Sequence, residues 1–331
     1  MTGRSAGTGV PAPRGARRGR TARHLALLLG GAVFVLWAVA TLTFFAIRLI
    51  PGDPAQAILG GPGSQASQEA LDQVRSDYGL DEPLIVQYFA MLGRLLTGDL
   101  GTSYTLKVPV AELLGAQIGG TLLLAVCSLA AAWVLALGLS LWSTGRGRIA
   151  SALGQGIELV AAALPHFWLA AVLIAVFSTG LGWFPPVATG TPAGLVLPVT
   201  TLAIPLAGFL AQVMRESLID AMRQPFVVSA RARGESALGI RFRHTIRHAA
   251  LPGISLSGWA LGWLLSGAVV VETIFAMPGL GRTLLQAVTL RDIPVVTGVV
   301  LLVAFVYVVM TVLTDLVARV ADPRLAQEGA R

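Results

Sequence analysis

The sequence is poor in charged residues, in cysteine and in lysine. Only 12% of its residues are charged, whereas an ordinary soluble domain has about 25%. Together with 55% hydrophobic residues and a mean hydropathy of +0.74, this shortage excludes a soluble globular domain and predicts an integral membrane protein. The single cysteine, Cys127, lies in an apolar run. The sequence therefore predicts neither a disulfide framework nor a cysteine metal site.

Lysine is almost absent, and this excludes one kind of nucleotide site. Of the 24 basic residues only Lys107 is a lysine, and it follows Leu106. A phosphate-binding loop needs a lysine directly after a glycine, so we expect no ATP site of this type. We also expect no other bound cofactor and no catalytic residue in this chain. In a membrane protein, basic residues that give a net charge of +7 indicate which segments lie on the cytoplasmic side of the bilayer. We expect no nucleic-acid partner.

Six apolar stretches are long enough to cross a bilayer. A spanning helix needs roughly 20 apolar residues. The stretches are 25–47, 119–142, 159–181, 193–214, 254–271 and 293–314. The first stretch follows an arginine-rich segment, as the apolar core of a signal peptide does. Its apolar run is longer than the usual core of a signal peptide, so we expect an uncleaved membrane anchor. The fold class predicted is an all-α polytopic membrane protein with six transmembrane helices.

The basic residues are sorted between the two sides of these six stretches. One side has 18 of them, and the other side has six, counted along the sequence. Because basic residues are retained on the cytoplasmic side, both termini are predicted to be cytoplasmic in a multi-pass protein of the cell membrane. The segments predicted are a basic tail (1–24), the first helix (25–47), an extracytoplasmic loop region (48–117), a five-helix core (118–320) and a cytoplasmic tail (321–331).

Particular residues within these segments predict how the helices meet. The long outer loop has eight acidic and four basic residues, and we expect it to form a small lid or a helical pair. Small residues recur every four positions at Gly258, Gly262 and Ser266, which would let a second helix approach that face closely. Pro165 and Pro205 interrupt the third and fourth stretches. We expect a tolerated kink at each.

The cytoplasmic segment of about 215–252 is too long for a simple turn. It contains a helix-competent run of small and apolar residues from Gln224 to Glu235, in which Gly234 is a helix-ending residue. A second basic stretch follows and ends at Leu251 and Pro252. A short helix ended by glycine and carrying few bulky side chains suits docking into a groove on a partner protein.

This segment resembles the cytoplasmic loop motif of the permease subunits of binding-protein-dependent ABC importers, in particular those of the dipeptide, oligopeptide and nickel group. The match comprises Ser229-Ala230, Gly234 and Leu251-Pro252, with Val228 at the position of the motif's leading glutamate. Further similar features lie along most of the chain. They are Ile50-Pro51-Gly52-Asp53-Pro54, Tyr78-Gly79-Leu80-Asp81-Glu82-Pro83 with Gln87-Tyr88, Gly98-Asp99-Leu100-Gly101-Thr102-Ser103, Val271-Glu272-Thr273-Ile274-Phe275, Pro278-Gly279-Leu280-Gly281, Arg291-Asp292 and Asp322-Pro323-Arg324.

The resemblance implies a MetI-like type I importer permease. Its implied partners are a second homologous permease subunit, two ATPase subunits, an extracytoplasmic solute-binding protein and the lipid bilayer. It implies transport of di- or oligopeptides, or of a related small solute such as nickel, driven by the ATPase subunits. The residues implied to form the ATPase-coupling helix are Val228, Ser229, Ala230, Arg231, Ala232, Arg233, Gly234 and Glu235, with Leu251 and Pro252 at the end of the loop.

Three other polar residues are functional candidates. Glu272 lies at the outer end of the fifth stretch; a carboxylate there either lines a path or gate or accepts hydrogen bonds from the turn at Pro278-Gly279. His244 and His248 are one helical turn apart, but no third ligand lies near and arginines surround them. We therefore expect no metal site.

Two other classes of membrane protein remain as alternatives. An intramembrane serine protease would use the serine of Gly253-Ile254-Ser255, yet the last stretch contains no histidine to act as its base. An ion-coupled secondary transporter would couple transport through intramembrane carboxylates or broken helices. It would have no need for a cytoplasmic docking helix.

Overall fold

The computed structural model describes residues 14–49, 52–60, 65–144, 147–236 and 239–321. Within these ranges the chain is helical, apart from turns, loops and one isolated bridge between Thr102 and Pro109. The predicted all-α class is therefore confirmed. Five described helices are long and apolar enough to cross a membrane, or six if one bent pair counts as a span.

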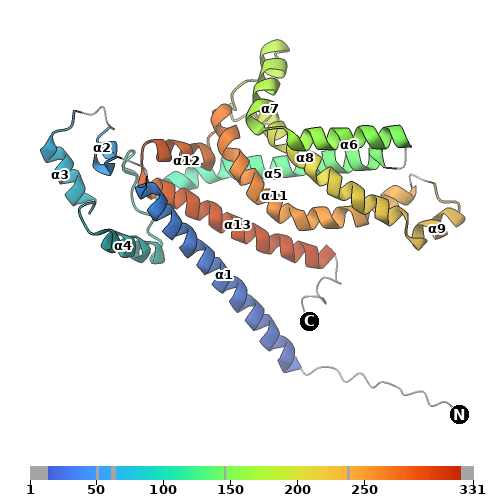
Figure 1. The fold of residues 1–331 in the computed structure, drawn as a ribbon, viewed down its shortest axis with the longest axis horizontal. Helices are drawn as coiled ribbons and strands as arrows, with labels where there is room; N and C mark the ends of the chain where they lie inside the picture. The colour runs from blue at the N-terminus through green and yellow to red at the C-terminus, as the bar shows by residue number, and fades with distance from the viewer. Residues whose placement is uncertain (1–13, 50–51, 61–64, 145–146, 237–238, 322–331) are drawn as a thin grey trace.

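The N-terminal part is one long helix followed by three short ones (Figure 1). Helix α1 (Arg14–Arg48) begins inside the expected tail, so the boundary expected at residue 24 lies within a helix. The loop region contains α2 (Pro54–Ile58), α3 (Gln68–Asp77) and α4 (Leu84–Leu96). Asp53 and Ser67 cap α2 and α3, because each accepts a hydrogen bond from a first-turn amide.

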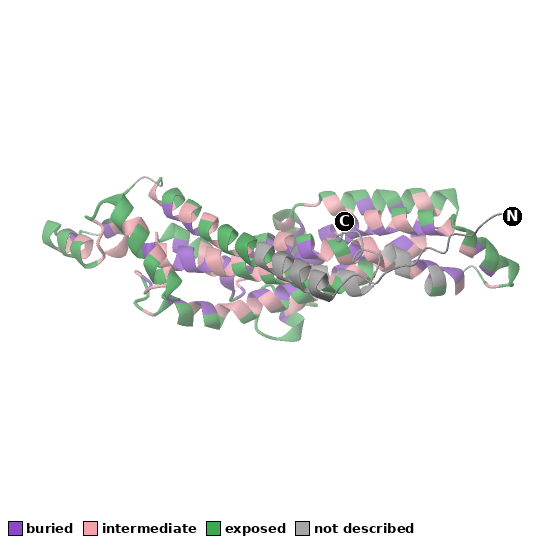
Figure 2. Ribbon diagram, turned by 90° about the horizontal axis from the view of Figure 1, so that it is seen from below, coloured by how far each residue is buried: buried purple, intermediate pink, exposed green. Residues whose placement is uncertain are grey.

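The core of the bundle lies between α5 (Val110–Ser143), α8 (Pro192–Met222) and α11 (Ile246–Ile274). Leu124, Leu210 and Leu264, one from each helix, are fully buried there. Helix α13 (Ile293–Ala321) packs between α1 and α11. The outward faces of these helices remain exposed (Figure 2), as expected of side chains that face lipid.

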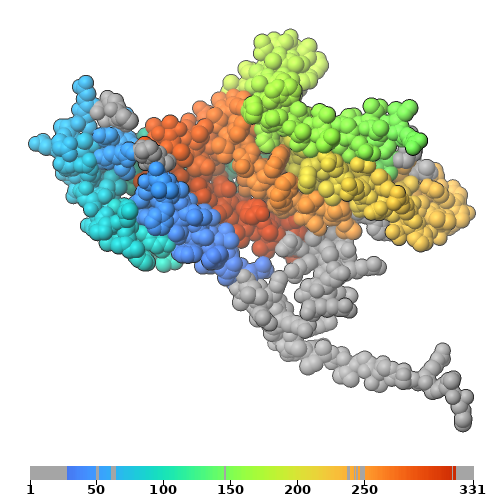
Figure 3. Space-filling model, in the orientation of Figure 1, coloured from blue at the N-terminus to red at the C-terminus, as the bar shows by residue number. Residues whose placement is uncertain are grey.

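The third expected span, 159–181, is not a straight helix. Helix α6 (Arg148–Ala163) meets α7 (His166–Leu173), which continues into the π-helical segment η1 (Ile174–Gly180), at an angle of 103°. Leu164 precedes a proline and is extended, at φ −70° and ψ 123°, because the proline ring disfavours the helical conformation of the residue before it. Helix α7 therefore stands out from the bundle (Figure 3).

Pro205 behaves differently from Pro165. It lies inside the uninterrupted α8 together with Pro198, and both prolines are buried. Helix α8 is the most buried of the candidate spans, with 61% of its most apolar stretch buried. Neighbouring helices hold it in place, so a proline is tolerated there without breaking the helix.

Small residues allow two pairs of helices to approach closely. A Cβ atom at Gly262 would collide with the Tyr307 ring of α13, and one at Gly258 would contact Thr314. The predicted close approach is thus confirmed at these two glycines, whereas Ser266 is exposed. On the other side of the bundle, a Cβ atom at Gly208 of α8 would lie 2.5 Å from the backbone nitrogen of Ala162 in α6.

The connections between long helices gather at the two ends of the molecule. Helix α9 (Pro225–Ala232) lies at one end, and α2, α3, α4 and α12 (Leu280–Thr289) lie at the opposite end (Figure 1). The sequence predicted that the segment containing α9 and the segments containing α2, α3, α4 and α12 lie on opposite sides of a bilayer. The structure therefore has a basic end that carries α9 and an end with most of the acidic loop residues.

Candidate functional site

The candidate docking element is the short helix α9. Gln224 precedes it in an extended conformation (φ −74°, ψ 151°), and Pro225 occupies its first turn, where a proline is pre-organised for a helix. The helix ends at Ala232, Arg233 is its C-cap residue, and Gly234 follows with a φ of +82°. This left-handed conformation suits glycine and turns the chain away from the helix axis.

The two faces of α9 differ in burial. Val227 and Ala230 are buried and pack on Ile240, together with Met222 and Phe226. The other face carries Val228, which is 66% exposed. The remaining exposed residues of the predicted coupling set are Ser229, Arg231, Ala232, Arg233 and Gly234. The packed face joins α9 to the bundle, and the exposed face presents small, apolar and basic groups.

Other parts of the predicted coupling segment lie elsewhere. Glu235 is half-buried, and its backbone amide donates to the Ala230 carbonyl at 3.2 Å. Leu251 and Pro252, expected at the end of the loop, lie inside α11. Because α8 reaches Met222 and α11 begins at Ile246, the connecting segment is shorter than the expected range of 215–252.

A buried ion pair lies near the end of α8 that leads to α9. The Nε atom of Arg215 donates to Oε2 of Glu158 in α6 at 2.8 Å, and the Glu158 side chain is fully buried. The Arg215 side chain is 13% exposed. The pair holds the α9-bearing end of α8 against α6. Sequence reasoning missed it because the partners are 57 residues apart; the only signal was a carboxylate beside an apolar stretch.

Glu272 lies at the junction of three helices. Its Oε1 accepts from the hydroxyl of Thr121 in α5 at 2.6 Å, and its Oε2 accepts from the backbone amide of Arg282 in α12 at 3.0 Å. The Leu280 amide donates to the same Thr121 hydroxyl oxygen at 2.8 Å. The carboxylate is fully buried. The carboxylate thus accepts from the first turn of α12 and not from the expected turn at Pro278-Gly279 just before it, and its role as path or gate stays a prediction.

Two further polar side chains lie on different helices, Ser255 in α11 and His166 in α7. Ser255 is exposed and donates to the Leu251 carbonyl at 3.3 Å. His166 in α7 packs edge-on against Trp263. The side chains of His244 and His248 lie outside the described residues. Among described residues, no group of three His, Cys, Asp or Glu side chains could hold a metal ion.

The outer end is held together by two carboxylates. Asp292 is buried and accepts from the Ser103 hydroxyl at 2.5 Å and the Thr105 amide at 3.0 Å. Asp53 accepts from the Arg75 guanidinium at 2.6 Å. Burial alone would raise the pKa of Asp53, but the hydrogen bonds from Arg75 and from the Ala55 amide outweigh it and lower the pKa.

Comparison with known proteins gives matches along most of the chain. Residues 134–327 match the family model described as the inner membrane component of binding-protein-dependent transport systems, and residues 22–118 match the model of its N-terminal part. A "Putative peptide transport system permease protein" of Brucella suis is 36% identical over 305 residues, with 89% of this chain and 96% of the relative covered.

Two further matches agree with this one. The glutathione transport system permease protein GsiC of Salmonella paratyphi A is 34% identical over 298 residues, with 89% of this chain and 96% of the relative covered. A solved structure of the MetNI methionine ABC transporter, in an inward-facing conformation, is similar in fold, with a TM-score of 0.53 and 18% identity over 63% of this chain and 96% of that chain. This chain thus belongs to the inner membrane components of binding-protein-dependent transport systems, the permease subunits of ABC importers.

Proposed function

We propose that this chain is the translocation subunit of a peptide-type ABC importer and that α9 docks on a separate ATPase subunit. The observation that carries the proposal is the two-faced geometry of α9. One face is packed into the bundle through Val227 and Ala230, while Val228 on the other face is 66% exposed at one end of the molecule. The relatives named for peptide and glutathione transport support the cargo class.

The packing of α9 supports a lever mechanism. Val227 and Ala230 contact Ile240 in η2 (Ile240–Thr245), which leads directly into α11. Only Arg223 and Gln224 separate α9 from α8. A displacement of α9 by the closing ATPase dimer would therefore move the ends of two core helices together. This would rock the bundle between inward-open and outward-open states as a rigid body.

The importer that we propose contains further subunits around this chain. A second permease subunit completes the path, two ATPase subunits supply ATP hydrolysis, and an extracytoplasmic binding protein delivers the cargo. Both termini are cytoplasmic, and the end with α2, α3 and α4 faces the binding protein. This chain itself binds no cofactor and carries out no catalysis.

Uptake by the reconstituted importer tests the proposal. Proteoliposomes that contain the permeases, the ATPase subunits and the binding protein should accumulate a labelled peptide only with ATP. Val228→Glu should lower uptake at least about tenfold, because it places an unpaired carboxylate in the docking interface. Leu106→Glu, a matched change at an exposed residue of the opposite end, should leave ATPase association intact.

One outcome would contradict the proposal. Uptake that persists without ATP and follows a proton or sodium gradient would identify an ion-coupled secondary transporter.

For testing the docking of α9, a substitution at Gly234 is less informative than one at Val228. The φ of +82° at Gly234 means that any other residue would strain the backbone itself.

A further inference from the structure

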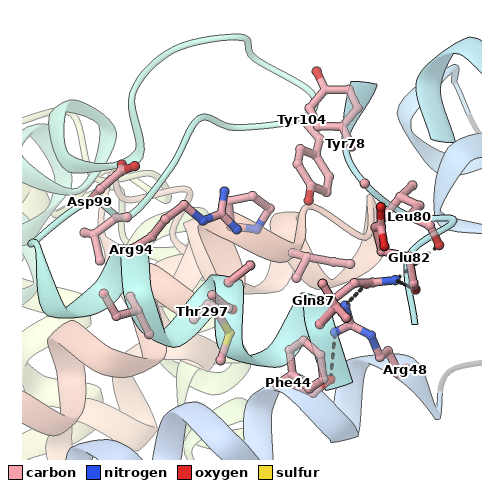
Figure 4. Close-up of a pocket in the computed structure, with 18 residues that line it drawn as sticks. Phe44, Arg48, Tyr78, Leu80, Glu82, Gln87, Arg94, Asp99, Tyr104 and Thr297 are labelled. Atoms are coloured by element: carbon pink, nitrogen blue, oxygen red, sulfur yellow. Dashed lines mark hydrogen bonds between the residues drawn. The ribbon is translucent and has the colours of Figure 1, made fainter. Parts of the chain in front are cut away.

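Two cavities lie end to end along the outer halves of α1 and α13. The first, here named the head pocket, has a volume of about 330 Å³ and is lined by residues of α1, α4, the start of α13 and two intervening loops (Figure 4). The second, here named the tail groove, has a volume of about 560 Å³ and lies between α1, α4 and α13. Leu95 and Leu100 line both cavities, so the two are adjacent.

The two cavities lie at different depths. The apolar span of α1 ends at Arg48, and that of α13 begins at Ile293; both residues line the head pocket. The head pocket is therefore at the level where two spans leave the hydrocarbon. The tail groove begins further in along α1, at Ala40, and reaches Val33. Val33 lies about 22 Å along α1 from Arg48. Because transmembrane helices are tilted, its depth is smaller than this length, and the groove ends near the middle of the bilayer, about 15 Å from the edge of the hydrocarbon.

The head pocket presents two guanidinium groups. Arg48 donates to Gln87 Oε1 at 2.5 Å and to the Phe44 carbonyl at 3.1 Å, which holds it over the Phe44 ring. Arg94 extends from α4 into the pocket in Figure 4. Within the described part of the chain, its guanidinium has no hydrogen-bond or ion-pair partner. Two exposed carboxylates, Glu82 and Asp99, lie at the edges of the pocket.

The tail groove is apolar along its whole length. Its lining comprises Val33, Leu36, Trp37, Ala40, Leu92, Leu95, Leu96, Leu100, Gly298, Leu301 and Leu302. Next to Ala40 the Trp37 indole donates to the Tyr88 hydroxyl at 3.1 Å, which gives this N–H group a partner inside the hydrocarbon. Among the described residues, no charged side chain lines the groove.

We propose that these two cavities together bind one glycerophospholipid molecule of the outer leaflet. Its phosphodiester accepts hydrogen bonds from Arg94 and Arg48, and one acyl chain lies in the tail groove. Arginine recognises phosphate oxygens through paired N–H donors, and the adjacent groove lies at the depth of the acyl chains. A small soluble anion would fill only the head pocket, whereas a phospholipid fills both cavities. The lipid would fasten α1 and α4 to α13.

Photo-cross-linking to a phospholipid tests the site. The full-length chain is placed in nanodiscs of phosphatidylethanolamine and phosphatidylglycerol that contain a trace of phospholipid with a photoreactive acyl chain. Cross-links are mapped by mass spectrometry of peptides. Wild-type protein should give cross-links concentrated on α1, α4 and α13 at residues of the tail groove.

Two variants examine the two halves of the site separately. Arg94→Gln should lower these cross-links about tenfold through loss of a charge-assisted hydrogen bond. Val33→Trp should lower them similarly by filling the groove, and it disturbs little packing because Val33 is 66% exposed. Arg223→Gln, which removes an exposed arginine at the opposite end, should leave them unchanged.

The contradicting results are distinct. If Arg94→Gln and Val33→Trp both leave the cross-links unchanged, the cavities hold no lipid. If free inorganic phosphate protects Arg94 from a guanidine-modifying reagent while Val33→Trp has no effect on the cross-links, the ligand is a soluble anion. If Arg223→Gln lowers the cross-links as much as Arg94→Gln, the attraction is a general effect of charge. Each of these results overturns the proposal.

Discussion

Glu272 and Asp292 are both buried carboxylates that accept hydrogen bonds from the first turn of a following helix. Glu272 accepts from the Arg282 amide of α12, and Asp292 accepts from the Val295 amide of α13 at 3.4 Å. A helix N-terminus has unpaired amides and a partial positive charge, so it stabilises an anion there. This pairing explains how two carboxylates are accommodated in the outer part of an apolar bundle.

Replacing Glu272 should destabilise the junction between α5, α11 and α12. In Glu272→Gln the amide group of the new side chain cannot accept at both positions, so either Thr121 or the Arg282 amide loses its acceptor. We expect the free energy of unfolding to fall by about 1–3 kcal/mol. Thermal unfolding of the purified protein in detergent measures this. An unchanged melting temperature would show that the carboxylate has no structural role and would favour a path or gate.

The pairing of Asp53 with Arg75 should make the stability of α2 and α3 depend on pH. The pKa of Asp53 is lower in the folded protein, so the stabilisation is present above the unfolded value of about 3.9 and is lost as the pH falls through the folded value. Asp53→Asn keeps a capping side chain but removes the charge.

Hydrogen exchange of the α2 and α3 amides measures this dependence on pH. Protection in Asp53→Asn should be lower than in wild type near pH 7, by up to about 1 kcal/mol. The difference should shrink as the pH is lowered towards about 3, where the wild-type carboxylate is increasingly protonated. A difference that is the same at both pH values would contradict a role for the charge.

At this scale the sequence pointed to a neighbour for Glu272 alone. It indicated that Glu272 could meet the turn before α12, because both lie close together in the chain. It gave no indication of Thr121, which is 151 residues away from Glu272, or of the link from Asp292 to Ser103 across 189 residues. Such contacts depend on how the helices pack, and a single sequence carries no direct signal of that.

The helices themselves were predictable from apolar length, whereas their bends were not. Pro165 and Pro205 were both expected to produce kinks, yet one accompanies a 103° bend and the other lies in a continuous helix. The difference is one of surroundings: Pro205 is buried between neighbouring helices, whereas exposed aromatic residues, Phe167 and Trp168, follow Pro165. Local sequence cannot distinguish these surroundings.

The contact between α6 and α8 should depend on the absence of a side chain at Gly208. A Cβ atom there would lie 2.5 Å from the Ala162 nitrogen and 2.7 Å from the Glu158 carbonyl oxygen, both backbone atoms that cannot move aside easily. Gly208→Ala should therefore separate the two helices and strain the Arg215–Glu158 pair. We expect the free energy of unfolding to fall by about 1–3 kcal/mol.

Gly138 provides the matched control. It lies inside α5, and no atom of a neighbouring helix lies within 4 Å of the position that a Cβ atom would take there. Gly138→Ala should be neutral or stabilising by up to about 1 kcal/mol, since alanine favours the helix. Both variants are compared by thermal unfolding in the same detergent. Equal effects of the two changes would show that the tight α6–α8 contact is not what Gly208 provides.

At the scale of the whole molecule, the two ends have different structures and charges. The end that carries α9 corresponds to the arginine-rich side of the sequence, and the opposite end corresponds to the acidic loop region (Figure 1). The alternation of apolar stretches predicted which segments lie at the same end, whereas the assignment of the arginine-rich end to the cytoplasm stays a prediction from the charge pattern. The extent of α8 and α11 into the connecting segment was missed, since polar helical turns extend beyond an apolar stretch.

Cross-linking from α9 tests most directly whether this end docks on the motor subunit. In a Cys127→Ser background, Val228→Cys carries a short photoactivatable reagent in the assembled transporter, and Leu106→Cys at the opposite end serves as the comparison. The account predicts an adduct with the ATPase subunit from Val228→Cys and none from Leu106→Cys. An ATPase adduct from Leu106→Cys, with none from Val228→Cys, would contradict it.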